Sequence, residues 1–268
     1  MMRFLKSFNC TIIMRRTLLT FALLIGLSGF INAQSPKREF RAVWLTTVWR
    51  IDWPKTNGAT AQKNEMTALL DQLQSNNINA VCFQVRGRCD AFYNSAYEPW
   101  SSDLGVNRGT NPGYDPLQFV LDEAHKRGIE VHAWLNPYRY ESTYNAWSNI
   151  TLKGNYRYSN PDWIIDYPSG LAILNPGIPE VRQRIVDVVT DILGKYDVDG
   201  IIFDDYFYGS GTTDAMDQAQ YIISNPTGMS RANWRRDNVN KMIKAVYDKI
   251  QTIKSYITFG VSPAGVAK

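Results

Sequence analysis

The feature that most constrains the fold is a regular alternation of strand-like and helix-like segments. Five short runs are rich in β-branched and aromatic residues, as buried parallel strands are, and lie at residues 41–48, 79–86, 130–136, 200–205 and 258–263. Apolar side chains at helical spacing predict the helices between them, at residues 60–75, 115–128, 179–193 and 231–253. Strand–helix–strand repeats of this kind indicate an α/β fold with a parallel sheet and right-handed crossovers.

The connections between these segments are asymmetric. Long loops follow the second and third strands, at residues 87–113 and 140–179, whereas a helix-to-strand return such as residues 126–128 is short. Long loops on one side only are typical of the mouth of a (β/α)8 TIM-type barrel. A doubly wound nucleotide-binding sheet is the alternative, but no strand is followed by Gly-x-Gly-x-x-Gly or by a phosphate loop.

The number of strands does not complete a barrel. About five strands precede Lys268, while a closed (β/α)8 barrel needs about eight. We therefore predict a barrel that is truncated after about five strands, with residues 34–268 forming the amino-terminal part of a catalytic domain. Its first and last strands would be open edges, which favour aggregation.

Residues 1–33 have the pattern of a secretory signal peptide. Four basic residues and no acidic residue precede or border an apolar run at residues 18–31, and the segment closes on Ile31-Asn-Ala33. The run is shorter than the roughly 20 residues of a spanning helix, so we expect no stable membrane anchor. The sequence thus predicts a periplasmic or secreted protein whose mature chain begins near Gln34.

The charge of the chain argues against a nucleic-acid partner. The net charge of +4 comes from 29 basic and 25 acidic residues, and removal of the four basic residues of the first segment leaves 25 of each. No basic cluster remains to neutralise phosphates. Of the 3 cysteines, Cys82 and Cys89 remain in the mature chain. Export permits a disulfide between them, but Cys82 lies within a strand pattern that equally suits a buried free thiol.

Carboxylates follow the fourth predicted strand directly. In Asp199-Gly-Ile-Ile-Phe-Asp-Asp-Tyr206, a short apolar run ends in Asp204 and Asp205, where a barrel strand delivers side chains to the mouth. The alternative is structural, with Asp205 capping the next element or both side chains simply solvated. Adjacent residues of an extended strand point to opposite faces, so these two are not expected to form a complete catalytic pair by themselves.

Other kinds of chemistry have weaker support. The 2 histidines, His125 and His132, lie within a helix and a strand pattern and form no zinc-type spacing. A Gly-x-Ser-x-Gly elbow for a serine nucleophile is also missing from the sequence. Aromatic residues make up 13% of the chain and gather beside polar residues at strand exits, as in platforms for sugar rings. We therefore predict a carbohydrate ligand, no metal and no cofactor.

Several motifs together resemble those of the bacterial glycosyl hydrolase-like family 10. The resemblance extends from residue 38 to residue 268 and rests on Phe83-Gln-Val-Arg86, Asp90-Ala-Phe-Tyr93, Glu98-Pro-Trp-Ser101, Tyr114-Asp-Pro-Leu117, Glu123-Ala-His-Lys-Arg-Gly128, His132-Ala-Trp-Leu-Asn-Pro-Tyr-Arg139 and the run from Asp199 to Tyr208. It implies an exported (β/α)8-barrel glycosidase, with some members associated with peptidoglycan glycan strands. Two departures are Gly209, where the family usually has proline, and the missing last strands.

The resemblance also assigns roles to residues. Asp-Gly-x-x-x-Asp is similar to the fourth-strand nucleophile motif of retaining α-glycosidases, with Asp204 as nucleophile or charge stabiliser and Asp205 in support. Independently of the resemblance, Glu98 and Glu141 are the carboxylates of this chain that are placed to supply the acid. The substrate-binding residues expected at the strand exits are Arg86, Trp134, Asn136, Tyr138, Arg139 and Tyr206.

Each assignment has a structural alternative. Arg86 could form an ion pair with Asp90 or Glu98, and Trp134 could be a core aromatic. For the whole chain, the alternative to a hydrolase is a glycan-binding barrel protein without catalysis. The discriminating feature is a second carboxylate at roughly 5–5.5 Å from Asp204 for retention or 6.5–9.5 Å for inversion.

Overall fold

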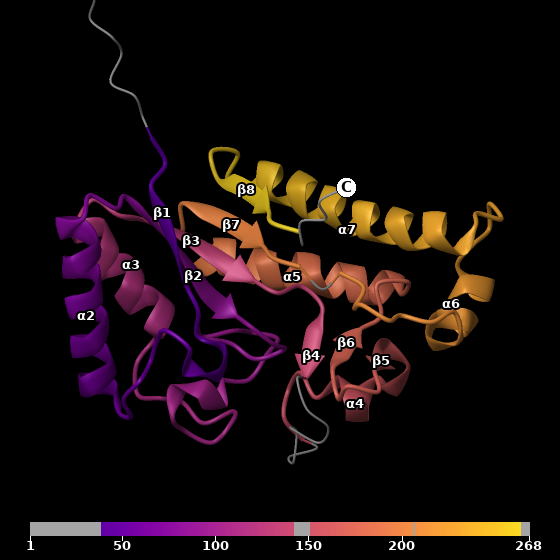
Figure 1. The fold of residues 1–268 in the computed structure, drawn as a ribbon, viewed down its shortest axis with the longest axis horizontal. Helices are drawn as coiled ribbons and strands as arrows, with labels where there is room; N and C mark the ends of the chain where they lie inside the picture. Colours follow the sequence, from indigo (N-terminus) through magenta and orange to yellow (C-terminus); the bar gives the residue numbers. More distant parts are fainter. Residues whose placement is uncertain (1–38, 142–150, 206, 264–268) are drawn as a thin grey trace, which may run out of the picture. The chain divides into compact units, whose positions relative to one another are not determined.

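The computed structural model describes residues 39–141, 151–205 and 207–263. Its main sheet has five parallel strands in the order β1-β2-β3-β7-β8 (Figure 1). The strands are β1 (Ala42–Leu45), β2 (Ala80–Arg86), β3 (Glu130–Leu135), β7 (Gly200–Phe203) and β8 (Thr258–Val261). The described sheet is not closed, so β1 and β8 each pair with a single neighbour. This confirms the parallel α/β arrangement predicted from the sequence.

The register places the carboxyl ends of the strands at one edge of the sheet. Leu45 pairs with Phe83, and Phe203 pairs with both Leu135 and Val261. The segments that follow β2, β3 and β7 therefore leave the sheet on the same side. Any chemistry carried by these loops is gathered at that edge.

The helices that connect the strands lie where apolar periodicity predicts them. Asp115 caps α3, because its side chain accepts a hydrogen bond from the backbone N–H of Gln118, and Pro116 occupies the first turn. Pro179 similarly begins α5. The helices of the described residues are α2 (Ala59–Ser75), α3 (Pro116–Lys126), α4 (Tyr156–Ser159), α5 (Pro179–Lys195), α6 (Gln218–Ile223) and α7 (Arg231–Ile253), with short 3-10 turns η1 (Val48–Arg50), η2 (Ser102–Leu104), η3 (Pro161–Trp163) and η4 (Ala215–Asp217).

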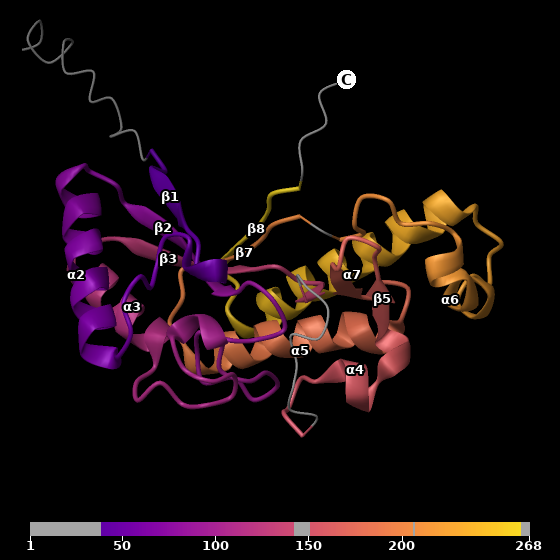
Figure 2. The same cartoon turned by 60° about the horizontal axis from the view of Figure 1, so that its bottom comes forward.

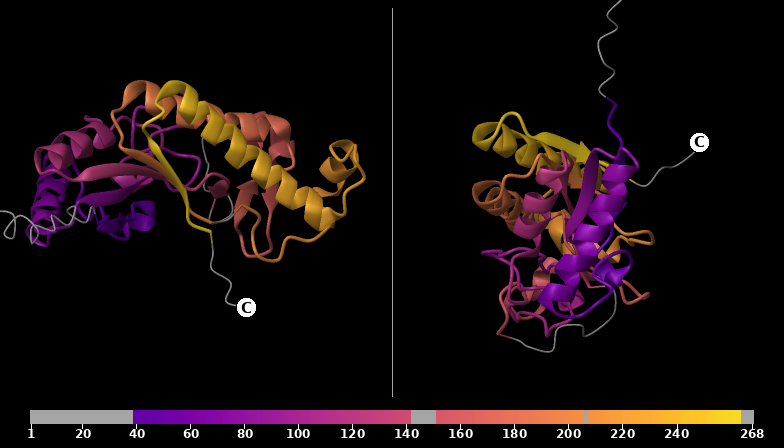
Figure 3. Two further views of the ribbon diagram at one scale, coloured as in Figure 1. Left: turned by 90° about the horizontal axis from the view of Figure 1, so that it is seen from above. Right: turned by 90° about the vertical axis from the view of Figure 1, so that its left-hand side faces the viewer.

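One face of the sheet packs against these helices. Alternate residues of the central strands, such as Phe83, Ala133 and Phe203, are buried in one core together with α5 residues such as Val189 and Ile192. Helices α5 and α7 run side by side, and Figures 2 and 3 show them on one side of β7 and β8. This is the strand-and-helix layering of a barrel wall.

The other face of the sheet carries a row of ring side chains. Trp44 and Trp134 meet edge to face with ring centroids 4.7 Å apart, and Phe40 contacts His132 in the same way at 5.1 Å. A Cβ on Gly200 would lie only 2.1 Å from Nδ1 of His132, so glycine is needed beside that ring. This face corresponds to the interior side of a barrel wall, and Trp44 is still 45% exposed on it.

The expectation of a plain loop at residues 140–179 was wrong. This segment includes β4 (Arg139–Glu141), β5 (Ile164–Asp166) and β6 (Ala172–Leu174), which pair antiparallel in the order β4-β6-β5. Each strand has three residues, too few to give a clear period-two pattern. The small sheet contributes Tyr140 and Ile173 to the core and gives the loop a fixed shape.

Two predictions fall on residues that the structure does not describe. The expected signal peptide at residues 1–33 and the expected ligand-binding residue Tyr206 both lie outside the described residues. In the part that is described, no helix is both long enough and apolar enough to cross a membrane.

Candidate functional site

The two carboxylates of the fourth predicted strand lie at the exit of β7. The backbone N–H of Asp204 donates to the carbonyl of Leu135 at 3.4 Å, so the residue is still attached to the end of β3. Burial raises the pKa of Asp204 to about 7, while nearby Arg139 and Trp134 act to lower it. A partly buried carboxylate with a strongly shifted pKa at a strand exit is a feature of functional sites.

Trp134 lies beside Asp204 on the same face of the sheet. Indole Nε1 of Trp134 and Oδ1 of Asp204 are both buried, and the Trp134 side chain acts as a hydrogen-bond donor that lowers the pKa of Asp204. The ring of Trp134 also packs edge to face against that of Trp44. Trp134 is thus partly a packing residue, as the structural alternative expected. A donor aimed at a carboxylate favours its ionised form, so Trp134 belongs to the surroundings that set the charge of Asp204.

Asn136 connects the exits of β3 and β7. Its Oδ1 accepts a hydrogen bond from the backbone N–H of Arg139 at 2.8 Å, and its Nδ2 donates to the carbonyl of Asp205 at 3.2 Å. The side chain is fully buried. Asn136 therefore positions the carboxylate segment and holds the turn that carries Arg139.

Arg139 supplies positive charge next to Asp204. The residue is 9% exposed, and its guanidinium donates from Nη1 to the carbonyl of Gly87 at 3.4 Å and is the leading electrostatic influence that lowers the pKa of Asp204. The structure thus brings together Trp134, Asn136, Arg139, Asp204 and Asp205. These five residues are called the carboxylate site below.

Arg86 and Glu98 are not part of this site. Arg86 donates from Nε and Nη2 to the two carboxylate oxygens of Glu98, at 2.7 and 2.6 Å, and from Nη1 to the carbonyls of Asn136 and Pro137. Both side chains are buried, at 1% exposure each. The prediction of a substrate-binding Arg86 and an acidic Glu98 is corrected here, because every strong donor and acceptor of the pair is already used inside the protein.

Tyr138 also faces the interior. It is fully buried, its ring meets that of Phe207 edge to face at 6.3 Å, and its hydroxyl has no partner among the described residues. Burial raises its pKa far above the usual range for tyrosine. Tyr138 thus lies beneath Phe207 and is not part of an open depression with Asn136.

Glu141, the other acid considered from the sequence, is likewise in an ion pair. It is fully buried on β4, and its Oε2 lies 3.1 Å from Nη2 of Arg157. Burial raises the pKa of Glu141, and the hydrogen bond from Arg157 opposes that rise. Neither Glu98 nor Glu141 is therefore exposed as a proton donor beside Asp204.

Metal ligands and thiols do not add to the site. Within residues 39–141, 151–205 and 207–263, no cluster of histidine, cysteine and carboxylate side chains could hold a metal ion. Cys82 and Cys89 are both buried free thiols, and burial raises the pKa of Cys82 to about 11. The disulfide considered from the sequence is not formed.

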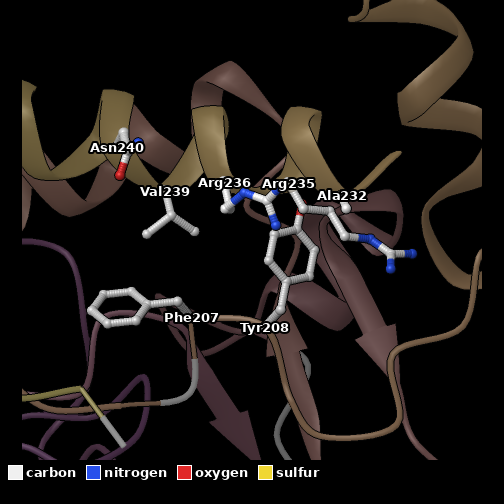
Figure 4. A pocket seen from close by; sticks show the side chains of 7 residues that line it. All are labelled: Phe207, Tyr208, Ala232, Arg235, Arg236, Val239 and Asn240. Carbon is white, nitrogen blue, oxygen red and sulfur yellow. The ribbon is translucent and has the colours of Figure 1, made fainter. Parts of the chain in front are cut away.

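Sequence reasoning missed a pocket just beyond the carboxylates. It has a volume of about 390 Å³ and lies between the segment after β7 and one face of α7 (Figure 4). Aromatic residues directly after the Asp-Asp pair were the available signal, but their partners come from a distant helix. The pocket, called the α7 pocket below, is lined by Phe207, Tyr208, Ala232, Arg235, Arg236, Val239 and Asn240.

Trp49 was also missed. It is 59% exposed, follows β1 within η1, and has a backbone φ of 54°, in the left-handed region that non-glycine residues rarely occupy. Its backbone N–H donates to Oδ2 of Asp103 at 3.2 Å, while Gln84 accepts from the preceding N–H of Val48. An exposed indole is thus held firmly at the edge where the strands end.

Comparison with known proteins begins with the sequence. The profile of the family described as Glycosyl hydrolase-like 10 matches residues 39–268. The chain is 42% identical over 247 residues to Glycosyl hydrolase YngK of Bacillus subtilis, covering 90% of this chain and 48% of that protein. It is 40% identical over 252 residues to Glycosyl hydrolase DigH of Escherichia coli K12, covering 88% of this chain and 57% of that protein. The chain thus spans about half the length of the relatives it matches.

Solved structures share the fold at low sequence identity. An α-L-fucosidase isoenzyme 2 from Paenibacillus thiaminolyticus aligns with a TM-score of 0.54 at 14% identity, over 83% of this chain and 32% of that one. An α-galactosidase from Lactobacillus brevis aligns with a TM-score of 0.52 at 10% identity, over 85% and 27%. Both are TIM-barrel glycosidases, which confirms the predicted fold class.

Proposed function

Because this chain belongs to the glycosyl hydrolase-like 10 family, we propose that it carries the nucleophile side of a glycoside hydrolase that cleaves O-glycosidic bonds of a bacterial cell-envelope glycan. The observation that supports this most is Asp204, a carboxylate at a strand exit with its pKa raised to about 7. Such a group is poised between its charged and neutral forms near neutral pH. Its role is that of nucleophile or charge stabiliser.

The surroundings of Asp204 suit a developing positive charge. Cleavage of a glycosidic bond passes through an oxocarbenium-like state, which a carboxylate in a partly water-excluded site stabilises strongly. Arg139 favours the ionised form of Asp204 and so keeps the carboxylate available despite its burial. Asp205 supports the same region as a second negative charge, which acts to raise the pKa of Asp204.

Substrate orientation is assigned to the residues around Asp204. Trp134 acts as a hydrogen-bond donor to Asp204 and so helps to hold the carboxylate that faces the substrate. Trp44 and Trp49 expose indole surface, at 45% and 59%, on which a pyranose ring can stack. Asn136 holds the segment rigid and does not itself contact substrate, since its side chain is buried and bonded.

The proton donor is proposed to come from outside the described residues. Glu98 and Glu141 are both buried in ion pairs with arginine, so neither is free to protonate a leaving oxygen. The five described strands form one wall with two open edges. A donor on a further segment would face Asp204 across the site, at the separation that decides between retention and inversion.

The substrate and location follow from the sequence pattern and the family. The signal-peptide pattern of residues 1–33 supports export to the periplasm or the medium. The glycan that an exported bacterial enzyme meets first is that of the envelope, and the peptidoglycan glycan strand is our proposed substrate. The resemblance supports the same choice, because it implies a family in which some members are associated with peptidoglycan glycan strands.

A glycan-binding protein without catalysis is the second candidate. The ion pairs of Glu98 and Glu141 favour it, because they remove the carboxylates considered as acids from the sequence. The two candidates differ in one measurement, the release of reducing ends. It is made on a chimera in which residues 39–268 replace the matching region of the Bacillus subtilis relative. Release by the chimera that Asp204→Asn abolishes supports the hydrolase, and a chimera that binds glycan but releases no reducing ends favours the binding protein.

A further inference from the structure

The α7 pocket has one apolar wall and one basic wall. Phe207 and Tyr208 form the first, and Figure 4 shows them across from the α7 face that carries Arg236 and Val239. Its volume of about 390 Å³ is within the range of small-molecule sites. Phe207 and Tyr208 follow Asp204 and Asp205 closely in the chain, so one wall of the pocket comes from the segment that leaves the carboxylate site.

The two arginines of the pocket are in different electrostatic situations. Arg235 is neutralised, since its Nε lies 2.6 Å from Oδ2 of the buried Asp217 and its Nη2 lies 3.2 Å from Asp214. Arg236 is exposed, and its Nη2 donates a hydrogen bond to the side-chain oxygen of Asn233. Among the described residues, no carboxylate forms an ion pair with Arg236. The pocket therefore presents one uncompensated positive charge.

Tyr208 and Phe207 are each supported by a neighbouring side chain. The hydroxyl of Tyr208, which lines the pocket, is buried beside the side chain of Asn238, and a hydrogen bond from Asn238 lowers the pKa of Tyr208 against the larger effect of burial. The ring of Tyr138 packs edge to face against that of Phe207. The aromatic wall of the pocket is therefore held in place by Tyr138 and Asn238, which leaves the face of Phe207 available to a ligand.

We propose that the α7 pocket is a subsite for a carboxylate-bearing sugar unit of the glycan, with the sugar ring against Phe207 and the carboxylate at Arg236. The inference rests on the proposed function, because it assumes that the chain engages a glycan. An inorganic anion would leave the apolar surface of Phe207 and Val239 unused, and a neutral sugar would leave the charge of Arg236 unused. A pyranose ring with an acidic substituent uses both walls.

The test compares two forms of one ligand. A glycan-strand tetrasaccharide with free carboxylates and the same tetrasaccharide with its carboxylates methyl-esterified are titrated into the 268-residue chain by calorimetry. We expect the free acid to bind about five- to tenfold more tightly than the ester at low salt, with the difference shrinking as salt is added. Equal affinity of the chain for acid and ester would overturn the proposal.

Substitutions test whether Arg236 causes the preference for the free acid over the ester. Arg236→Gln should reduce the acid-to-ester ratio to about one by weakening acid binding alone, while Arg236→Lys keeps most of the ratio. Lys249→Gln is the matched control, since Lys249 is exposed on the distal part of the same helix. Phe207→Leu should weaken both ligands by a similar factor, and thermal unfolding checks that each variant is folded. If Arg236→Gln weakens acid and ester equally, the pocket does not recognise the carboxylate.

The result is separable from the proposed hydrolysis. Asp204→Asn should leave the acid-to-ester ratio unchanged, because Asp204 does not line the pocket. Failure of Asp204→Asn to affect glycan cleavage would contradict the proposed catalysis and leave the ratio intact. An acid-to-ester affinity ratio of one in the wild-type chain would contradict the subsite. It would not affect the conclusion about Asp204 in glycan cleavage.

Discussion

The guanidinium of Arg86 and the carboxylate of Glu98 form a two-point ion pair that is wholly inside the protein, with Nε–Oε2 and Nη2–Oε1 separations of 2.7 and 2.6 Å. Arg86 ends β2, and Glu98 belongs to the long loop that follows it. The pair therefore fastens the loop to the sheet. Arg86 also donates to the carbonyl of Pro137, which extends the same attachment to the exit of β3.

Removal of one partner of this pair should be strongly destabilising. Glu98→Ala leaves the Arg86 charge buried without a counter-ion, and we expect the free energy of unfolding to fall by about 3–5 kcal/mol in urea. The control is Asp248→Asn, which breaks an exposed pair with Lys244 and should cost less than about 0.5 kcal/mol. Equal losses in the two variants would mean that the Arg86–Glu98 pair is not a structural element.

Gly200 should not tolerate a side chain. In Gly200→Ala the new Cβ would meet the ring of His132 at 2.1 Å, and we expect a loss of about 1–3 kcal/mol of unfolding free energy. Gly194→Ala is the matched control, because nothing lies within 4 Å of that position on α5 and alanine favours helix by about 0.5–1 kcal/mol. The double variant Gly200→Ala with His132→Ala should recover part of the loss. No recovery would show that the clash lies elsewhere.

The main sheet and its helices were predictable because their signals are local. Helix α7 matches the predicted bounds of residues 231–253, and Pro179 and Asp115 fix the starts of α5 and α3 through proline geometry and capping. Strands β2 and β3 differ from prediction by a residue at one end. Each of these elements carries enough periodicity to be recognised without its neighbours.

Contacts between distant segments were not predictable in the same way. The β4-β6-β5 sheet consists of three-residue strands whose pairing depends on where the chain folds back. Arg86 lies at the end of a strand, as a ligand-binding residue would. It instead forms an ion pair with Glu98, a carboxylate of the following loop. The α7 pocket joins residues from the β7 exit and a later helix, so its charge balance becomes visible only in the structure.

Export of the chain is expected to remove its first segment. Amino-terminal sequencing of the protein recovered from the periplasm or medium of an expressing bacterium should start near Gln34, because signal peptidases cut after small residues such as Ala33. Replacing Arg15 and Arg16 with glutamate should reduce export, since the positive charge orients the segment. A membrane-bound product that begins at Met1 or Met14 would contradict the prediction.

Asp204 should make the stability of the protein depend on pH. Its pKa in the folded chain is raised by burial from the ordinary value of 3.8 to about 7, so between these values the folded state holds a proton that the unfolded chain has lost. The free energy of unfolding therefore falls as pH rises through this window. Asp204→Asn cannot ionise, and we expect it to be about 1–3 kcal/mol more stable than wild type at pH 8. The two should converge near pH 4. A variant that is less stable than wild type at pH 8 would contradict the raised pKa.

The last prediction concerns turnover. The 268-residue chain should release few reducing ends from peptidoglycan glycan strands, because its five described strands leave the site open to water and neither buried glutamate can act as the acid. A general acid typically accelerates the reaction about 10²–10⁴-fold. The chimera with the Bacillus subtilis relative should therefore cleave the strands, because the rest of the relative supplies such an acid. In the chimera, kcat/KM should rise with pH through about 7 as Asp204 ionises. Asp204→Asn should lower kcat at least about 10²-fold while sparing binding, since the shape is kept and the charge is lost. Full activity of the 268-residue chain would mean that the five described strands and their loops are enough for catalysis. If Asp204→Asn leaves the chimera fully active, the nucleophile role would be assigned to Asp205.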